Sequence, residues 1–231
     1  MSQHIKRIAA PKTWPILRKI RKYVIKTSPG PHTKEESIPI TIAIRDLLGY
    51  ARTLKEVKLL LNKKQVLVDG RVIKDPKFPV GIFDVISFPK PNEHYRVLIN
   101  THNKIVLKKI TPEEAKFKIV RIKVKKLVKG GKKQYGFNDG RTIVTDNDYK
   151  TSDSLLIELP TQKVIKHIPF AKGNYAFLTS GKHVGESGII EDVVKERITT
   201  KVVIKTKTSR FETLKKYVMM VGLEKPEITI E

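Results

Sequence analysis

Two short stretches decide the fold of this chain: Thr53-Leu54-Lys55-Glu56 and Val66-Leu67-Val68-Asp69-Gly70-Arg71. The first has the pattern of a capping box, in which the threonine and the glutamate bind each other's backbone N–H groups at the start of a helix. It predicts a helix that runs through Leu61. In the second stretch, Asp-Gly between apolar residues is the strongest short signal for a β-hairpin turn. A helix followed by a small antiparallel sheet is therefore expected here.

The neighbouring sequence extends this pattern on both sides. Residues 41–48 predict an earlier helix that ends at Gly49, since glycine tolerates the left-handed conformation found after helix ends. Strands are predicted over residues 65–69, 71–74 and 84–88, where apolar and β-branched residues gather. Two helices and an antiparallel sheet thus make up a module over residues 38–90.

Residues 1–37 form a basic arm. The arm has no acidic residue before Glu35, and several prolines prevent a long helix, although a short one fits residues 16–26. It contains few apolar residues, so we expect it to be disordered until it binds phosphates. Trp14 is expected to pack either on the protein itself or on a bound base or sugar; packing within the protein is the more common use of a lone tryptophan.

The region after Pro89-Lys90-Pro91, which reads as a domain boundary, is predicted to be mainly β. Residues 120–125 alternate apolar and basic side chains, so one face of a sheet is buried and the other is cationic. Thr111-Pro112-Glu113-Glu114 predicts one short helix with a threonine cap. Further strands are expected over residues 154–158 and 164–168, which completes a central β domain over residues 91–168.

Residues 169–231 contain short strands separated by glycines, a pattern typical of a small, sharply bent barrel. Residues 200–206 and 215–221 are expected to supply strands of this barrel. The whole chain is thus predicted to be mixed, mainly β (α+β): a basic arm (1–37), a helix-and-sheet module (38–90), a central β domain (91–168) and a barrel with a short tail (169–231).

Positive charge dominates the surface chemistry. Lys and Arg number 47 against 23 Asp and Glu, which leaves a formal net charge of +24. A small solvated domain usually carries a net charge of only about 2–8. Individual lysines are often no more than hydrated surface, but an excess along the whole chain indicates a polyanionic partner, and a nucleic acid is the obvious one. With aromatic residues at only 7 %, recognition of structured RNA by its shape is favoured over stacking on single strands.

Patterns for catalysis are weak. The chain has no cysteine, its six histidines are scattered, and the Rossmann and phosphate-loop patterns do not occur. Two carboxylate pairs, Glu113-Glu114 and Asp146 with Asp148, are explained by helix capping and by a polar turn. No secretory leader or membrane span is read from the sequence, and no cofactor or metal is expected.

Basic side chains in the arm and in the helix-and-sheet module are therefore the candidate RNA-binding residues. Flexible lysine and arginine stems suit phosphates better than base edges. The candidates are Lys6, Arg7, Lys12, Arg18, Lys19, Arg21 and Lys22 in the arm, and Arg52, Lys55, Lys58, Lys63, Lys64 and Arg71 in the module.

Several of these stretches resemble known RNA-binding modules. The α-L RNA-binding domain is one of them. It resembles residues 51–56 and 66–71, which contain the capping box and the Asp-Gly turn, together with Val80-Gly81-Ile82-Phe83-Asp84-Val85-Ile86. Residues 173–190 resemble a KOW module, with Gly188 at its signature glycine. Taken with residues 4–14 and Gly30-Pro31-His32, the order of segments is similar to the archaeal and eukaryotic small-subunit ribosomal protein family called "four-e".

The resemblance implies a structural constituent of the small ribosomal subunit that binds and stabilises folded rRNA in the cytoplasm, without catalysis. Its implied partners are small-subunit rRNA and neighbouring small-subunit ribosomal proteins, with no membrane and no small-molecule substrate. The short segment after Gly222 favours an archaeal form. Two alternatives stay open: a ribosome-associated RNA-modification enzyme such as a pseudouridine synthase, and a transcription-elongation factor, since both classes use such modules.

Overall fold

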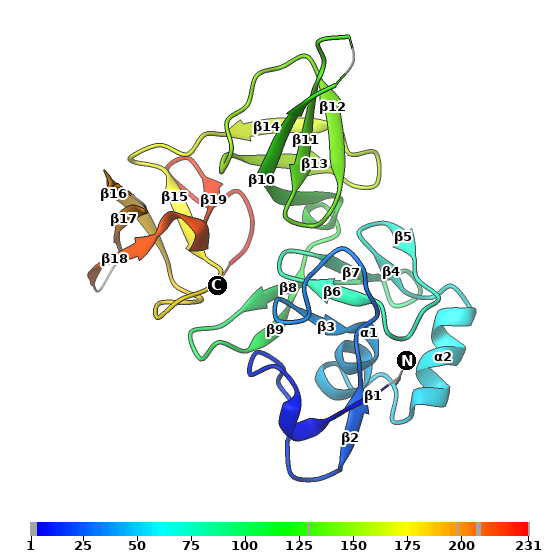
Figure 1. The fold of residues 1–231 in the computed structure, drawn as a ribbon. Helices are drawn as coiled ribbons and strands as arrows, with labels where there is room; N and C mark the ends of the chain where they lie inside the picture. Colours follow the sequence, from blue (N-terminus) through cyan, green and yellow to red (C-terminus); the bar gives the residue numbers. More distant parts are fainter. Residues whose placement is uncertain (1–3, 129, 198, 207–208, 231) are drawn as a thin grey trace. The chain divides into compact units, whose positions relative to one another are not determined.

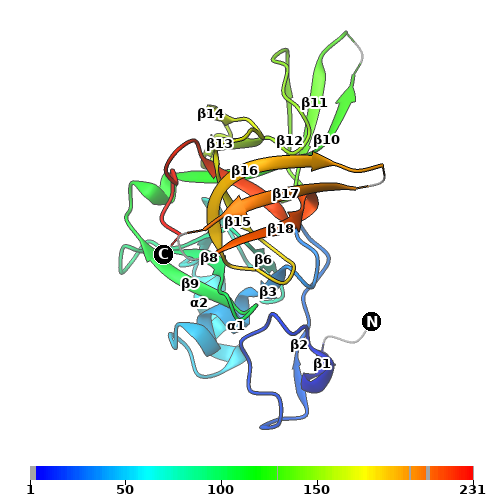
Figure 2. The ribbon, with the colours of Figure 1, turned by 90° about the vertical axis from the view of Figure 1, so that its left-hand side faces the viewer.

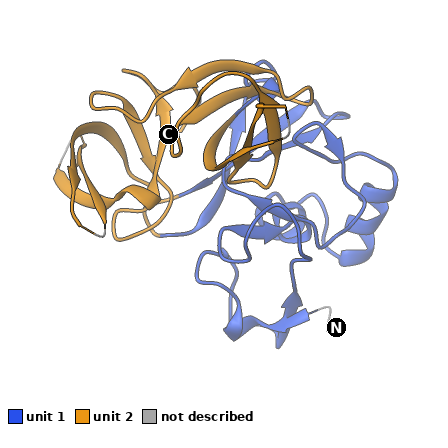
Figure 3. Cartoon of the chain, turned by 45° about the horizontal axis from the view of Figure 1, so that its top comes forward, with its two compact units in different colours: residues 1–99, 103–118 blue, residues 100–102, 119–231 orange. Residues whose placement is uncertain are grey.

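Antiparallel strands dominate the fold, as the alternating sequence pattern predicts, and the mixed, mainly β class is confirmed (Figure 1). The computed structural model describes residues 4–128, 130–197, 199–206 and 209–230. The chain divides into two units (Figure 3). Unit 1 comprises residues 1–99 and 103–118, and unit 2 comprises residues 100–102 and 119–231.

Unit 1 is built on a five-stranded antiparallel sheet with the strand order β5-β4-β7-β8-β9. The predicted Asp69-Gly70 turn is confirmed, because both residues have positive φ (50° and 75°) and join β4 to β5. The long β8–β9 hairpin was not predicted from the sequence. The bounds are β4 Leu67–Val68, β5 Arg71–Val72, β7 Val85–Phe88, β8 Glu93–Ile99 and β9 Ile105–Ile110. A separate strand pair joins β3 (Ser37–Pro39) to β6 (Pro79–Gly81).

Both predicted helices are present in unit 1. The first begins as α1 (Ile40–Ile42) and continues as a π-helical turn, η2 (Ala43–Leu47), before Gly49 with φ +70°. The second, α2 (Leu54–Asn62), starts at the predicted capping box. Its Val57 and Leu61 side chains are fully buried, because they lie on the face of the helix that packs against the core.

The described part of the arm, residues 4–37, is ordered, so the prediction of a disordered segment is wrong for these residues. Its first strand, β1 (His4–Lys6), pairs antiparallel with β2 (Tyr23–Ile25), and η1 (Arg7–Ala9) is a short 3₁₀ turn. The short helix considered for residues 16–26 is replaced in part by β2. Order comes from contacts distant in the sequence: Trp14 and Val24 belong to the same buried cluster as Ile38, Ile44 and Leu61.

The Pro89-Lys90-Pro91 stretch lies in the turn between β7 and β8, whose residues Phe88 and Glu93 are paired. The sheet of unit 1 therefore continues across the predicted domain boundary, and this unit extends to residue 118. Contacts group the arm, the helix-and-sheet module and the start of the central region together. The finer division at residues 37, 90 and 168 stays a prediction.

The first half of unit 2 is a second five-stranded sheet, with the order β12-β11-β10-β13-β14. Its core includes Val120, Ile122, Tyr135 and Leu155. The predicted strands 154–158 and 164–168 are confirmed with the same bounds. The strands are β10 Phe117–Leu127, β11 Lys133–Phe137, β12 Thr142–Thr145, β13 Ser154–Glu158 and β14 Val164–Ile168. The short helix predicted near residue 113 is the 3₁₀ turn η3 (Glu114–Lys116) of unit 1.

The second half of unit 2 is a bent sheet with the order β18-β17-β16-β15-β19, as a small barrel module requires (Figure 2). Strand β16 curves strongly, and its pairing with β17 shifts register between Ile190 and Asp192, which bends the sheet. Strand β18 was not predicted. The bounds are β15 Tyr175–Leu178, β16 Ser187–Lys195, β17 Thr200–Lys205, β18 Arg210–Leu214 and β19 Val218–Gly222, with η4 (Lys215–Tyr217) before β19.

Gly188 is required by close packing in this bent sheet. A Cβ atom at this position would lie 2.5 Å from the backbone oxygen of Lys205. We expect Gly188→Ala to destabilise unit 2 by at least about 2 kcal/mol, because backbone has to move to relieve the overlap. Faster hydrogen–deuterium exchange in β15–β17 measures this loss.

Gly136 in β11 provides the matched control, since a Cβ there would meet nothing closer than 3.7 Å. Gly136→Ala should change stability by less than about 0.5 kcal/mol. Unchanged exchange in Gly188→Ala would show that the sheet tolerates the methyl group and that the packing argument is wrong.

Candidate nucleic-acid interface

Trp14 belongs to the buried core of unit 1 and so fixes the arm to the rest of this unit. Its side chain is completely buried, and its Nε1–H donates a 2.7 Å hydrogen bond to the backbone oxygen of Ser37. The open question from the sequence is thereby answered: Trp14 packs on the protein itself. The basic residues on either side of it are consequently held in fixed positions.

Two of the arm's candidate RNA-binding residues also bind the arm's own backbone. Arg7 is only 8 % exposed, and its Nε–H donates to the Leu17 oxygen at 2.8 Å. Arg18 donates to the backbone oxygens of Ile8, Ala10 and Pro11 at 2.9–3.0 Å. Both guanidinium groups thus shape the arm. Contact of Arg7 or Arg18 with phosphate stays a prediction.

The capping box holds the start of α2. The Glu56 backbone N–H donates to the Thr53 hydroxyl at 3.3 Å, and the Arg52 backbone N–H donates to the Glu56 carboxylate at 2.7 Å. The Arg52 N–H and the Thr53 hydroxyl lower the pKa of Glu56, because both bind its charged form. The side chains of Arg52, Lys55 and Lys58 remain exposed around this fixed helix start.

Two grooves lie between the arm and the helices of unit 1. The larger, of 530 Å³, is lined by both ends of the β1–β2 pair and by residues of η2 and α2, among them His4, Arg21, Tyr23, Arg45, Leu54 and Lys58. The smaller, of 440 Å³, is lined by residues that include Arg7, Ile20, Arg21, Arg45 and Arg52. Arg7, Arg21 and Arg45 line both grooves. The structure therefore brings Arg7, Arg21, Arg52 and Lys58 together from distant parts of the sequence.

The other candidates lie outside these two grooves. They are exposed apart from Arg18, which is half-buried: Lys6, Lys12, Arg18, Lys19 and Lys22 belong to the arm, Lys55, Lys63 and Lys64 to α2 and the turn after it, and Arg71 to β5. Sequence reasoning missed Arg45 and Tyr23 as groove residues. Arg45 lies in a helix predicted only for its apolar pattern, and no local signal links Tyr23 to α2.

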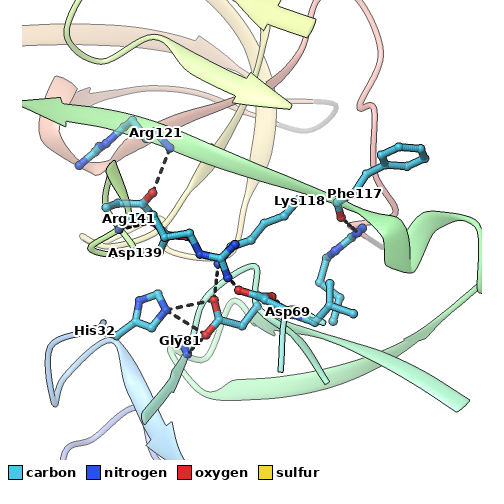
Figure 4. A network of polar contacts seen from close by, with 12 residues as sticks. His32, Asp69, Gly81, Phe117, Lys118, Arg121, Asp139 and Arg141 are labelled. Carbon is cyan, nitrogen blue, oxygen red and sulfur yellow. Dashed lines mark hydrogen bonds and ion pairs between the residues drawn. The ribbon is translucent and has the colours of Figure 1, made fainter. Parts of the chain in front are cut away.

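Unit 1 also contains a buried polar network (Figure 4). Lys118 is 1 % exposed and donates to Asp69 Oδ2 at 2.8 Å and to Asp84 Oδ1 at 2.6 Å. His32 Nε2 lies 3.0 Å from the same Asp84 oxygen, and the Gly81 backbone N–H donates to Asp84 Oδ2 at 2.9 Å. The network joins residue 32 to the sheet and to the last residue of unit 1.

The two aspartates also accept hydrogen bonds from backbone N–H groups. Asp69 Oδ1 accepts a 2.9 Å hydrogen bond from the Val85 N–H. Burial by itself raises the pKa of the Asp84 carboxyl, but His32 and Lys118 outweigh burial and hold that pKa well below its ordinary value. Sequence reasoning assigned Asp69 to a turn and Asp84 to a strand start, and it assigned no role to Lys118.

One member of each carboxylate pair noted in the sequence takes part in an ion pair. Glu114 binds the buried Arg96 guanidinium, and its N–H donates to the Thr111 hydroxyl at 3.3 Å, as the capping pattern predicts. Asp148 pairs with Lys125 and Lys133, whose bonds lower the pKa of Asp148 to about 2. Among the described residues there is no group of three or more side chains suited to hold a metal ion. No helix in the described ranges is long and apolar enough to cross a membrane.

Comparison with known proteins decides the family. Residues 91–164 match the family described as "Ribosomal family S4e", residues 1–35 match the RS4NT (NUC023) domain, and residues 47–86 match the S4 domain. The small ribosomal subunit protein eS4 of Methanosphaera stadtmanae is 44 % identical over 99 % of this chain and 95 % of its own length. The chain belongs to the ribosomal family S4e.

Other members of family S4e agree with this assignment. The eS4 protein of Nanoarchaeum equitans is 48 % identical over 84 % of both chains. The crystal structure of the 30S ribosomal protein S4e from Thermoplasma acidophilum has a TM-score of 0.72 and 30 % identity, and it covers 85 % of this chain and 99 % of its own. These relatives are archaeal, as the resemblance implied. The S4 match over residues 47–86 falls on α2, the Asp69-Gly70 hairpin and the first half of β7.

Proposed function

We propose that this member of family S4e holds folded rRNA on a surface that the arm and the helices of unit 1 form together. Membership of the family makes the protein a structural constituent of the small ribosomal subunit in the cytoplasm, and not an enzyme. Its partners are accordingly rRNA and neighbouring ribosomal proteins. The proposal concerns which part of the chain binds the RNA.

One observation carries the proposal: arginines of the arm and of η2 line both grooves, and Lys58 of α2 adds a cation to the larger one and Arg52 to the smaller one. Arg21 and Lys58 are exposed, and within the described part of the chain neither has an acidic partner. Cations that lack carboxylate partners are available to displace the counterions of a phosphate backbone, which is the main source of affinity for nucleic acids.

The rigid placement of the arm strengthens this argument. Binding through a disordered arm costs conformational entropy for every residue that becomes ordered. Here Trp14 and the β1–β2 pair already hold the arm in place, so that cost is met during folding of unit 1. A preformed cationic surface suits recognition of RNA by the shape of its backbone.

The comparisons do not support the two alternatives left open by the sequence, an RNA-modification enzyme and a transcription-elongation factor. Relatives that match nearly all of this chain over nearly all of their own length are small ribosomal subunit proteins. An RNA-modification enzyme requires a catalytic domain, and an elongation factor requires a different family relationship.

The test is the affinity of the full-length protein for small-subunit rRNA over a range of salt concentrations. We expect the double variant Arg21→Gln/Lys58→Gln to bind roughly ten- to hundred-fold more weakly, since it loses two charge-assisted contacts. The slope of log K against log salt should become shallower by about two, because about one counterion is released per phosphate contact.

Lys163→Gln/Lys182→Gln is the matched control, because it removes the same charge from exposed positions of unit 2. Its affinity and slope should stay close to those of the unaltered protein. If both double variants weaken binding equally, the total charge of the chain determines affinity and the proposed surface has no special role.

A further inference from the structure

The larger groove has walls of different chemistry. Its arm side carries the His4 and Tyr23 rings, which meet edge to face with centroids 4.5 Å apart. Its helix side carries the aliphatic Leu54 and, one turn further along α2, Lys58. The volume of 530 Å³ lies within the range of roughly 300–1,000 Å³ typical of small-molecule sites, and a single phosphate occupies far less.

Tyr23 is more exposed than a tyrosine that only packs in the core. Its side chain is 46 % exposed although it lies in a strand, and the Lys22 ammonium sits 5.3 Å from its ring centroid. An exposed aromatic ring bordered by cations is the arrangement that nucleic-acid-binding proteins use to stack an unpaired base.

Some charged side chains of the groove are already bound to other protein groups, and others are available to bind RNA. Arg45 is bound by Asp46 at 2.8 Å, and Asp75 accepts hydrogen bonds from the Ser28 hydroxyl and from the Lys77 N–H. Arg21 and Lys58, as described above, have no such partners. The groove therefore offers cations for a phosphate, Arg21 and Lys58 among them, next to an aromatic and aliphatic wall for a base.

We propose that this groove binds one unpaired rRNA nucleotide turned out of its stack, with its base on Tyr23 and its phosphate between Arg21 and Lys58. The inference rests on the proposed function and names what part of the RNA the surface selects. Proteins that recognise particular RNA sequences commonly bind at bulges and loops, where bases can leave the helix. Duplex RNA alone, by contrast, presents only its backbone to this surface.

The experiment compares two hairpin RNAs of equal length with the full-length protein. One hairpin carries a single unpaired 2-aminopurine, and in the other the same base is paired. We expect the bulged RNA to bind about ten-fold more tightly and its 2-aminopurine fluorescence to be quenched by stacking on Tyr23. Tyr23→Ala should abolish both the preference and the quenching, while Tyr23→Phe, which keeps the ring, should retain them.

Lys55→Gln provides the matched control on the same helix, because Lys55 is exposed but does not line the groove. It should weaken binding of both RNAs by the same factor and leave the preference for the bulge unchanged. Equal affinity of the unaltered protein for both RNAs would overturn the nucleotide site and leave the proposed function intact. A preference that survives Tyr23→Ala would overturn the assignment to this groove, and binding of neither RNA would overturn the proposed function as well.

Discussion

Replacement of Lys118 by methionine is expected to destabilise unit 1 by about 3–5 kcal/mol, which is the usual cost of removing one partner from a buried ion cluster. Lys118 is the cation shared by Asp69 and Asp84, and all three side chains are almost completely buried. Methionine fills similar space but leaves both carboxylates without their ammonium partner. The loss of stability therefore measures the cost of uncompensated buried charge rather than the cost of a cavity.

The chain offers a convenient probe for this measurement. Trp14 is its one tryptophan, and it lies in the core of unit 1. Urea unfolding followed by Trp14 fluorescence thus reports the stability of that unit. Lys116→Met removes the same charge from an exposed position two residues away and should shift the midpoint little. Equal shifts for the two variants would contradict a structural role for the buried network.

The same network predicts a dependence on pH with a definite sign. Since the pKa of Asp84 is lowered in the folded protein, its stabilising effect is present above the ordinary aspartate pKa of about 3.9. It is lost as the pH falls below that value towards the folded pKa. Unit 1 of the unaltered protein should accordingly lose stability on acidification below about pH 4, and Lys118→Met should lose less.

Deletion of residues 1–37 is expected to prevent unit 1 from folding cooperatively. The deletion removes Trp14 and Val24 from the core, together with Ser37, the first residue of β3. Loss of a buried tryptophan side chain alone costs about 3–5 kcal/mol, which is a large share of the 5–15 kcal/mol that stabilises a typical domain. If the arm were disordered, as expected from the sequence, its deletion would leave the folding of the rest of unit 1 unchanged.

Far-ultraviolet circular dichroism with urea unfolding measures the effect of the deletion. Trp14→Phe in the full chain is the milder comparison, because phenylalanine keeps an aromatic ring in the core and loses part of the buried volume and the bond to Ser37. We expect intermediate stability for this variant. A truncated protein with an unchanged unfolding transition for unit 1 would show that the arm is a separate segment after all.

Local signals explain which parts of the fold were predictable. The capping box at Thr53 and the Asp69-Gly70 turn specify their own conformations, so α2 and the β4–β5 hairpin were predicted from neighbouring residues alone. The order of the arm was not predictable in this way. It depends on a hydrogen bond between Trp14 and Ser37 and on a strand pair, β1–β2, whose members are separated by an irregular loop.

The candidate site likewise has features that the local sequence predicts and features that depend on the tertiary structure. Charge alone identified Arg21, Arg52 and Lys58 as candidates, but composition contains no information about which cations face one another. Tyr23 and Arg45 join them only because the arm folds across α2 and η2. Sequence reasoning assigned no role to Lys118, and only the tertiary structure places it between two aspartates.

The most direct test of the RNA-binding surface is ultraviolet cross-linking of this protein to rRNA within assembled small subunits, followed by identification of the cross-linked peptides. The proposed surface predicts cross-links in residues 18–25 of the arm and in residues 52–64, which include α2. Cross-links confined to residues 119–231 would contradict it, because unit 2 would then be the part of the protein that faces the RNA.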